Sequence, residues 1–114
     1  MGIDTYFYTI YGVKVPWDDA FSEAYNDVYD DNDTPWVLMD GMGGSYMIFG
    51  ISLFISGNLR WGFEKGDRYK EIDNPTELYF KDIDYRSNFN KKFPKFTHLL
   101  EDKQFKFISL IHYS

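Results

Sequence analysis

The spacing of the apolar residues changes at Pro16, and this change constrains the fold more than any other feature of the sequence. Residues 5–15 are mostly β-branched or aromatic and nearly alternate in character, which predicts a β-strand. In residues 16–29 the apolar positions recur at i, i+3, i+4 and i+7, which predicts a helix with one buried stripe. That stripe consists of Phe21, Ala24, Tyr25 and Val28.

Turn signals divide the rest of the chain into further elements. A glycine-rich turn separates the apolar residues 36–40 from residues 45–55, which predicts a hairpin, and residues 59–64 alternate as a third strand of a meander would. Asn74 and Pro75 begin a segment that permits a helix towards Asn90. The other predicted elements are a short segment over 69–72, a short helix over 95–102 and a closing strand over 105–111, placed inside the sheet.

Length and composition predict one domain. The 114 residues suit a single core, and the aromatic content of 21% means that rings should supply much of the buried surface. The predicted fold class is α+β, with an antiparallel sheet of about 4–5 strands, an N-terminal amphipathic acidic helix and one or two short C-terminal helices. We expect residues 1–114 to form this single globular domain.

Several classes of site are excluded by missing residues or spacings. The chain has no cysteine, which excludes disulfides, thiolate zinc sites and thiol catalysis. The acidic turn after the first helix lacks EF-hand spacing, and no serine has the Gly-x-Ser-x-Gly pattern of a nucleophile. No signal peptide and no apolar run of about 20 residues is present. We therefore expect a cytoplasmic protein without a cofactor or a metal ion.

The net charge of −6 is concentrated at one end of the chain. Residues 1–33 carry eight acidic residues and one lysine, whereas residues 60–114 carry eleven basic and nine acidic residues. On the first predicted helix, the acidic residues opposite the apolar stripe are Asp19, Glu23, Asp27 and Asp30. Like charges at i and i+4 destabilise a helix by a few tenths of a kcal/mol per pair, and no lysine at that spacing offsets them. This acidic face is the strongest candidate binding surface.

The predicted function is that of a non-enzymatic acidic protein that blocks or regulates a basic, nucleic-acid-handling partner protein. Carboxylates one helical turn apart are spaced by about 6 Å, comparable to successive phosphates along a nucleic-acid strand, so the helix would act as a nucleic-acid mimic. In size and charge the chain resembles virus-encoded inhibitors of host or defence enzymes, which act in the host cytoplasm. Direct binding to nucleic acid or to a membrane is not expected. The predicted partner-binding residues are Asp18, Asp19, Glu23, Asp27, Asp30, Asp31, Asp33, Trp17 and Trp36.

A small-ligand or nucleotide-binding module is the first alternative. The glycine turn before residue 45 could approach a ligand closely, although it precedes a strand and not the helix that a phosphate loop requires. Basic residues of the following segments would supply positive charge. The candidate residues are Gly41, Gly43, Gly44, Arg60 and Arg68.

An enzyme is the least favoured class. Its site would need dispersed acidic residues together with His98 or His112, the two histidines of the chain. Neither histidine has an acidic neighbour in the sequence at the spacing of a catalytic pair. No catalytic residue is therefore predicted.

Overall fold

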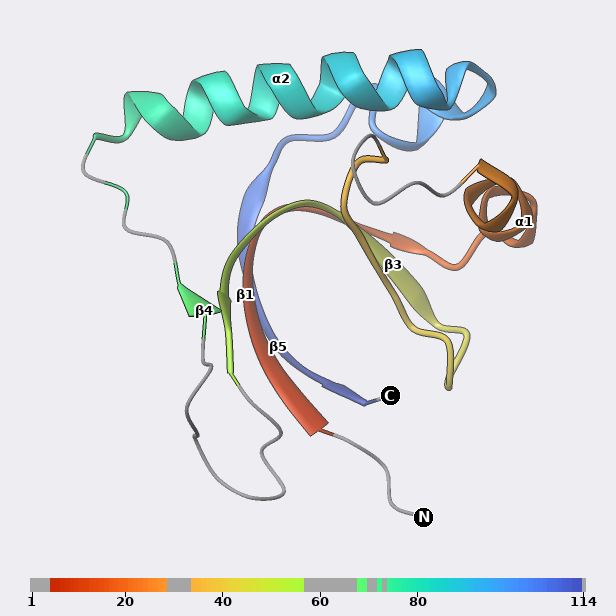
Figure 1. Ribbon diagram of the computed structural model, residues 1–114, viewed down its shortest axis with the longest axis horizontal. Helices are drawn as coiled ribbons and strands as arrows, with labels where there is room; N and C mark the ends of the chain where they lie inside the picture. Colours follow the sequence, from red (N-terminus) through yellow and green to blue (C-terminus); the bar gives the residue numbers. More distant parts are fainter. Residues whose placement is uncertain (1–4, 29–33, 57–67, 70–71, 73, 114) are drawn as a thin grey trace.

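The computed structural model describes residues 5–28, 34–56, 68–69, 72 and 74–113. They form a strongly curved antiparallel sheet, with one long helix across its convex side and a shorter helix at one end (Figure 1). No helix in this part of the chain is both long and apolar enough to cross a membrane. In chain order the elements are β1 (Thr5–Pro16), α1 (Asp19–Val28), β2 (Val37–Met39), β3 (Tyr46–Ile55), β4 (Arg68–Tyr69), α2 (Thr76–Lys92), the 3₁₀-helix η2 (Pro94–Leu99) and β5 (Lys106–Tyr113).

The sheet has the strand order β2-β3-β1-β5, and the two-residue β4 pairs with the far end of β3. All pairs are antiparallel, with Met39 opposite Met47 and Tyr8 opposite both Ile55 and Leu110. The predicted α+β class and the hairpin of β2 and β3 are confirmed. The third predicted strand, over 59–64, lies outside the described residues.

The placement of the closing strand inside the sheet was wrong. β5 is an edge strand, because it pairs with β1 alone among the described strands. Its apolar run does not reflect cover on both faces, since Phe107, Ile111 and Tyr113 are exposed. The helix expected over 95–102 is the 3₁₀-helix η2. The helix expected towards Asn90 is α2, which has 17 residues and is the longest helix among the described residues, so the expectation of only short C-terminal helices was wrong.

The sheet bends where two glycines face each other. Gly12 of β1 is paired with Gly50 of β3, and Gly50 has a φ of 155°. A Cβ on Gly12 would lie 2.1 Å from the carbonyl oxygen of Phe49, and one on Gly50 would lie 2.3 Å from that of Tyr11. Only residues without a side chain allow the two backbones to approach this closely.

The main core lies between the convex face of the sheet and the helices. Phe21 of α1 is fully buried, and its ring lies 5.1 Å from that of Phe49 and 4.9 Å from that of Phe93. From α2, Phe89 is also fully buried and contacts the same group of rings. The aromatic side chains therefore form a cluster of rings that holds both helices on the sheet.

Arg86 fixes the segment between η2 and β5. Its Nη1 donates a hydrogen bond of 2.8 Å to the carbonyl oxygen of Leu100, and its Nη2 donates to that of Lys103. Its guanidinium also pairs with Asp82 and lies 4.7 Å from the centre of the Phe105 ring. This one side chain connects α2 to the start of β5.

Candidate partner-binding surfaces

The start of α1 is organised by two of the predicted partner-binding residues. Asp18 caps the helix, because its Oδ1 accepts a hydrogen bond of 2.8 Å from the backbone N–H of Phe21. Trp17 donates from Nε1 to Oδ1 of Asp19 at 2.8 Å, which holds the half-buried indole beside the first exposed carboxylate of the helix. The structure therefore brings Trp17, Asp18 and Asp19 together at one end of α1.

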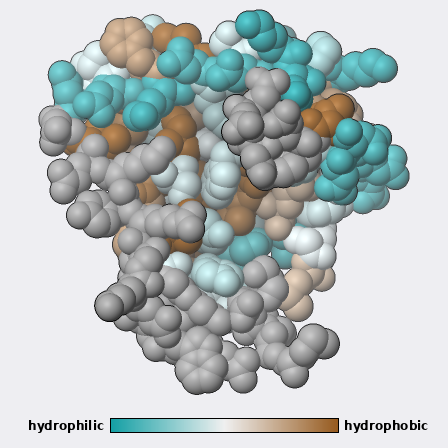
Figure 2. All heavy atoms as spheres, in the orientation of Figure 1, coloured by the Kyte–Doolittle hydropathy of each residue, from teal (hydrophilic) through white to brown (hydrophobic). Residues whose placement is uncertain are grey.

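The next two turns of α1 present Glu23 and Asp27 to solvent. Neither carboxylate forms an ion pair with a described residue, whereas Arg86 and Asp82 of α2 do pair with each other. The last turn of α1 carries no basic residue, so Asp27 lies at the negative end of the helix dipole. Figure 2 shows hydrophilic residues covering this end of the molecule.

An apolar groove of about 250 Å³ adjoins this acidic face. It runs between α1 and η2, and Asp27 and Val28 line its side on α1. The opposite wall consists of Phe93, Pro94 and Phe96 together with Lys92 and Lys95. No local pattern in the sequence brings η2 against α1, so this groove could not be predicted from the sequence.

Trp36 is not part of this surface. Its ring lies 6.1 Å from that of Tyr8, in a second cluster of apolar residues on the concave face of the sheet. The structure thus separates Trp36 from Trp17, although both were predicted to contact one partner. The predicted residues Asp30, Asp31 and Asp33 lie outside the described residues.

The glycine turn already holds an anion of its own. The carboxylate of Asp40 accepts hydrogen bonds from the backbone N–H groups of Gly43, at 3.0 Å, and Ser45, at 2.9 Å. A phosphate in a glycine-rich loop would need such donors. The turn also stands at the start of β3, whereas the backbone of Arg68 pairs with Ile55 at the other end of that strand. The structure therefore does not join Gly41, Gly43 and Gly44 to Arg68, and Arg60 lies outside the described residues.

A histidine that the sequence left without a partner is part of a buried polar group. Nδ1 of His112 lies 2.8 Å from the hydroxyl oxygen of Tyr46, and the ring of His112 packs edge-on against Tyr8. Burial lowers the pKa of His112 below its ordinary value, and the nearby Asp40 carboxylate opposes this shift without reversing it. Burial acts to raise the pKa of Asp40, but the hydrogen bonds from Ser45 and Gly43, together with the nearby His112, outweigh that effect and hold the pKa low.

This buried histidine predicts that the protein loses stability when it is mildly acidified. Because the pKa of His112 is lower in the folded chain than in the unfolded chain, the unfolded chain binds more protons below the ordinary histidine pKa. The contribution of neutral His112 to the free energy of unfolding is present above the ordinary histidine pKa. It is lost as the pH falls through the lower pKa that His112 has in the folded chain. We expect the urea concentration at the unfolding midpoint to decrease as the pH is lowered from about 7.5 to about 5.

The matched controls for this titration are His112→Gln and His98→Gln. The first should reduce the pH dependence, and the second should leave it intact, because His98 is exposed on η2. A wild-type midpoint that does not change over this pH range would contradict the prediction.

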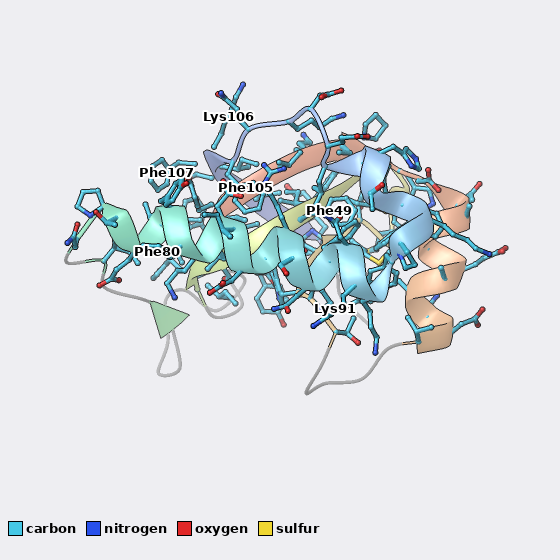
Figure 3. The ribbon with its side chains drawn as sticks, turned by 90° about the horizontal axis from the view of Figure 1, so that it is seen from above. Phe49, Phe80, Lys91, Phe105, Lys106 and Phe107 are labelled. Atoms are coloured by element: carbon cyan, nitrogen blue, oxygen red, sulfur yellow. The ribbon has the colours of Figure 1, made fainter. Side chains whose placement is uncertain are left out.

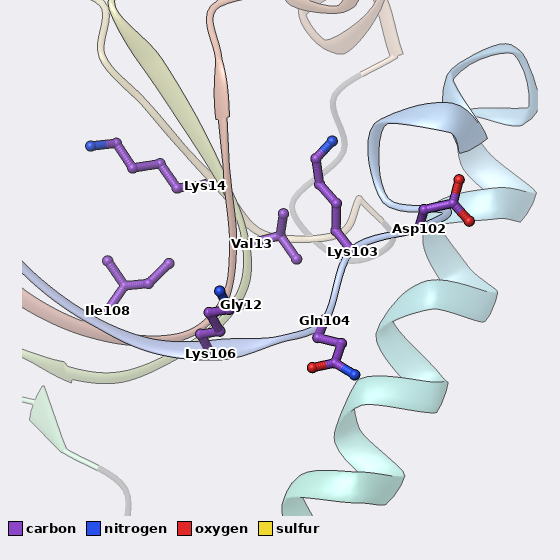
Figure 4. A pocket seen from close by; sticks show the side chains of 8 residues that line it. All are labelled: Gly12, Val13, Lys14, Asp102, Lys103, Gln104, Lys106 and Ile108. Carbon is purple, nitrogen blue, oxygen red and sulfur yellow. The ribbon is translucent and has the colours of Figure 1, made fainter.

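A second groove, of about 570 Å³, lies along β1 and the start of β5. Lys14, Lys103 and Lys106 line it together with Asp102, so its charge is opposite to that of the whole chain. Figure 4 shows the side chains of Lys14 and Lys103 pointing in different directions. The ammonium of Lys14 lies 5.0 Å from the centre of the Tyr46 ring. These lysines therefore do not converge on a single anion.

Comparisons with known proteins leave the function to be argued from this geometry. No family model, no curated protein and no solved structure matches the chain. Within the described ranges, no group of three or more histidine or acidic side chains is placed to hold a metal ion.

Proposed function

We propose that the protein is a non-enzymatic binding protein that docks the acidic face of α1 on a basic protein surface that otherwise binds nucleic acid. The observation that carries this proposal is the run of carboxylates on successive turns, Asp19, Glu23 and Asp27, all of them exposed. Such a run imitates the spacing of phosphates, so the partner would lose access to nucleic acid while it is bound. The protein would therefore act as an inhibitor or regulator, as a viral counter-defence protein does.

The energetics of α1 support a role beyond folding. Glu23 is four residues from both Asp19 and Asp27, so each pair places like charges at a destabilising spacing. Asp27 is unfavourable at the helix C-terminus for the separate reason of the helix dipole. Lys95 lines the same groove as Asp27 but does not form an ion pair with it. A surface selected only for stability would carry mixed charges.

The groove beside Asp27 suggests that the carboxylates and the apolar groove contribute differently to binding. Carboxylates at the rim of an interface mainly speed encounter and set orientation, whereas apolar pockets that exclude water supply most of the affinity. Val28 is 41% exposed at the edge of the groove, and Phe96 is half-buried in its wall. We infer that a large apolar side chain of the partner enters this groove.

Reversal of the three carboxylates should abolish binding without unfolding the protein. The wild-type protein should capture its partner from nuclease-treated lysate and should displace that partner from DNA. We expect the triple variant Asp19→Lys, Glu23→Lys, Asp27→Lys to do neither. Capture by the wild type should weaken by tenfold or more between about 50 and 200 mM salt. The folding of the variant should be little changed, because all three side chains are exposed and the reversals replace one set of like charges at i and i+4 by another. The hydrogen bond from Trp17 to Asp19 is lost, which should cost about 1 kcal/mol or less.

The control carries the same total charge elsewhere. Glu77, Asp84 and Glu101 are exposed outside α1, and their reversal to lysine also raises the net charge from −6 to 0. This variant should keep binding and displacement. If both variants lose the partner equally, only net charge matters, and the assignment to the α1 face is wrong.

A further inference from the structure

The outer edge of β5 is unusually open to pairing. β5 has eight residues and one charged side chain, Lys106, at its first position, and it contains no proline. Native proteins block edge strands of this length with charges, prolines or bulges, because free backbone groups invite another strand. Among the described strands, β1 is the sole neighbour of β5.

The hydrogen-bond pattern shows which groups lie on this edge. Both the N–H and the C=O of Phe7 bond Ser56, on the β3 side of β1. Backbone groups alternate in direction along a strand, so Tyr8 faces β5, where it is paired with Leu110. It follows that the N–H and C=O groups that point away from β1 belong to Phe107, Ser109, Ile111 and Tyr113.

We propose that β5 pairs antiparallel with β5 of a second copy, which makes a symmetric dimer with one continuous sheet. Only residues with outward backbone groups form hydrogen-bonded pairs, and centring the two-fold axis on Ser109 places Phe107 opposite Ile111 of the other copy. An aromatic ring opposite a β-branched side chain is a favourable cross-strand pair. This register pairs the outward groups of Phe107, Ser109 and Ile111 in both copies, and Tyr113 lies beyond the paired segment.

The exposed apolar surface beside this edge has the size that a dimer needs. Phe107, Ile111 and Tyr113 are exposed at 64%, 49% and 54% on one face of β5. Tyr79 and Ile83, exposed at 62% and 45%, lie on the side of α2 that Arg86 turns towards Phe105. Together they offer roughly 600 Å² per copy, against about 800 Å² per partner in a standard interface that includes its backbone.

The proposal is tested with two matched phenylalanines. Phe107 lies on β5, and Phe80, exposed at 59%, lies on α2 (Figure 3). Sedimentation equilibrium of the wild-type chain from about 1 to 200 µM should fit a monomer–dimer equilibrium. Phe107→Lys should raise the dissociation constant by about tenfold or more, because it places a charge in the paired face, and Phe80→Lys should leave it unchanged.

A cross-link tests the register. The chain has no cysteine, and a hydrogen-bonded pair at Ser109 would hold the two Cα atoms about 5.5 Å apart, within disulfide range. Oxidised glutathione should therefore convert Ser109→Cys to a covalent dimer faster than it converts Ser87→Cys, which is exposed on α2.

Three results would overturn the proposal: a monomer at every concentration, growth beyond the dimer, or a dimer that Phe107→Lys does not weaken. Dimerisation does not depend on the proposed partner of α1. The lysine reversals on α1 should accordingly leave the dimer intact, so failure of either idea is visible separately.

Discussion

Gly50→Ala is expected to lower the free energy of unfolding by about 3 kcal/mol or more. The added Cβ would lie 2.3 Å from the carbonyl oxygen of Tyr11 and 2.6 Å from Cα of Gly12, both of them backbone atoms of the paired strand. A side chain cannot move aside to relieve this contact, so β1 and β3 would have to separate at the bend. Urea unfolding followed by far-UV circular dichroism measures the loss.

Gly41→Ala is the matched control for this substitution. Gly41 is exposed in the turn before β3, and an added Cβ would meet nothing within 4 Å. Its effect should stay within about 0.5 kcal/mol. Equal stability of the two variants would show that the close approach of Gly12 and Gly50 does not hold in solution.

Phe21→Ala should destabilise the protein by about 3–5 kcal/mol. Phe21 is the one fully buried residue of α1, and its ring meets those of Phe49, Phe89 and Phe93. Truncation would leave a cavity in the centre of the aromatic cluster and would release the helix that carries the acidic face. Partner binding should therefore decline together with stability in this variant.

Phe80→Ala is the corresponding control, since Phe80 is exposed on α2 and touches only the Tyr79 ring among the aromatic contacts of the described residues. It should change stability by less than about 1 kcal/mol. Phe21→Leu should retain more stability than Phe21→Ala, because it fills part of the cavity. If Phe21→Ala were as stable as Phe80→Ala, α1 would not be held by this cluster.

Local patterns in the sequence predicted several of the described elements but not the partners of those elements. The change of period at Pro16 depends on neighbouring residues and appears as β1 followed by α1. The predicted buried stripe was wrong at Val28, which is 41% exposed, whereas Phe21 is fully buried. The pairing of Gly12 with Gly50 joins residues far apart in the chain, and no local signal marks it. The edge position of β5 was missed because alternation predicts a strand without saying what covers its faces.

In the candidate site too, the features set by nearby residues could be predicted, whereas those that join distant residues could not. Asp19, Glu23 and Asp27 could be assigned to one face from helical spacing alone, whereas the groove beside them required η2 to be placed against α1. The hydrogen bond between Tyr46 and His112 spans 66 positions, so the pair could not be recognised in the sequence. Trp36 was assigned to the acidic surface by its proximity in the chain, and proximity in the chain does not determine the face of a sheet.

The bend at Gly12 and Gly50 also divides the sheet into regions of unequal local stability. On one side of the bend, the first five residues of β1 and the last five residues of β3 are only half-buried. On the other side, the two strands pack against α1 and α2. Segments with few buried contacts open locally without unfolding the whole chain. The C-terminal half of β5 pairs with this weaker region, so a second copy bound there would protect the part of the fold that its own core protects least.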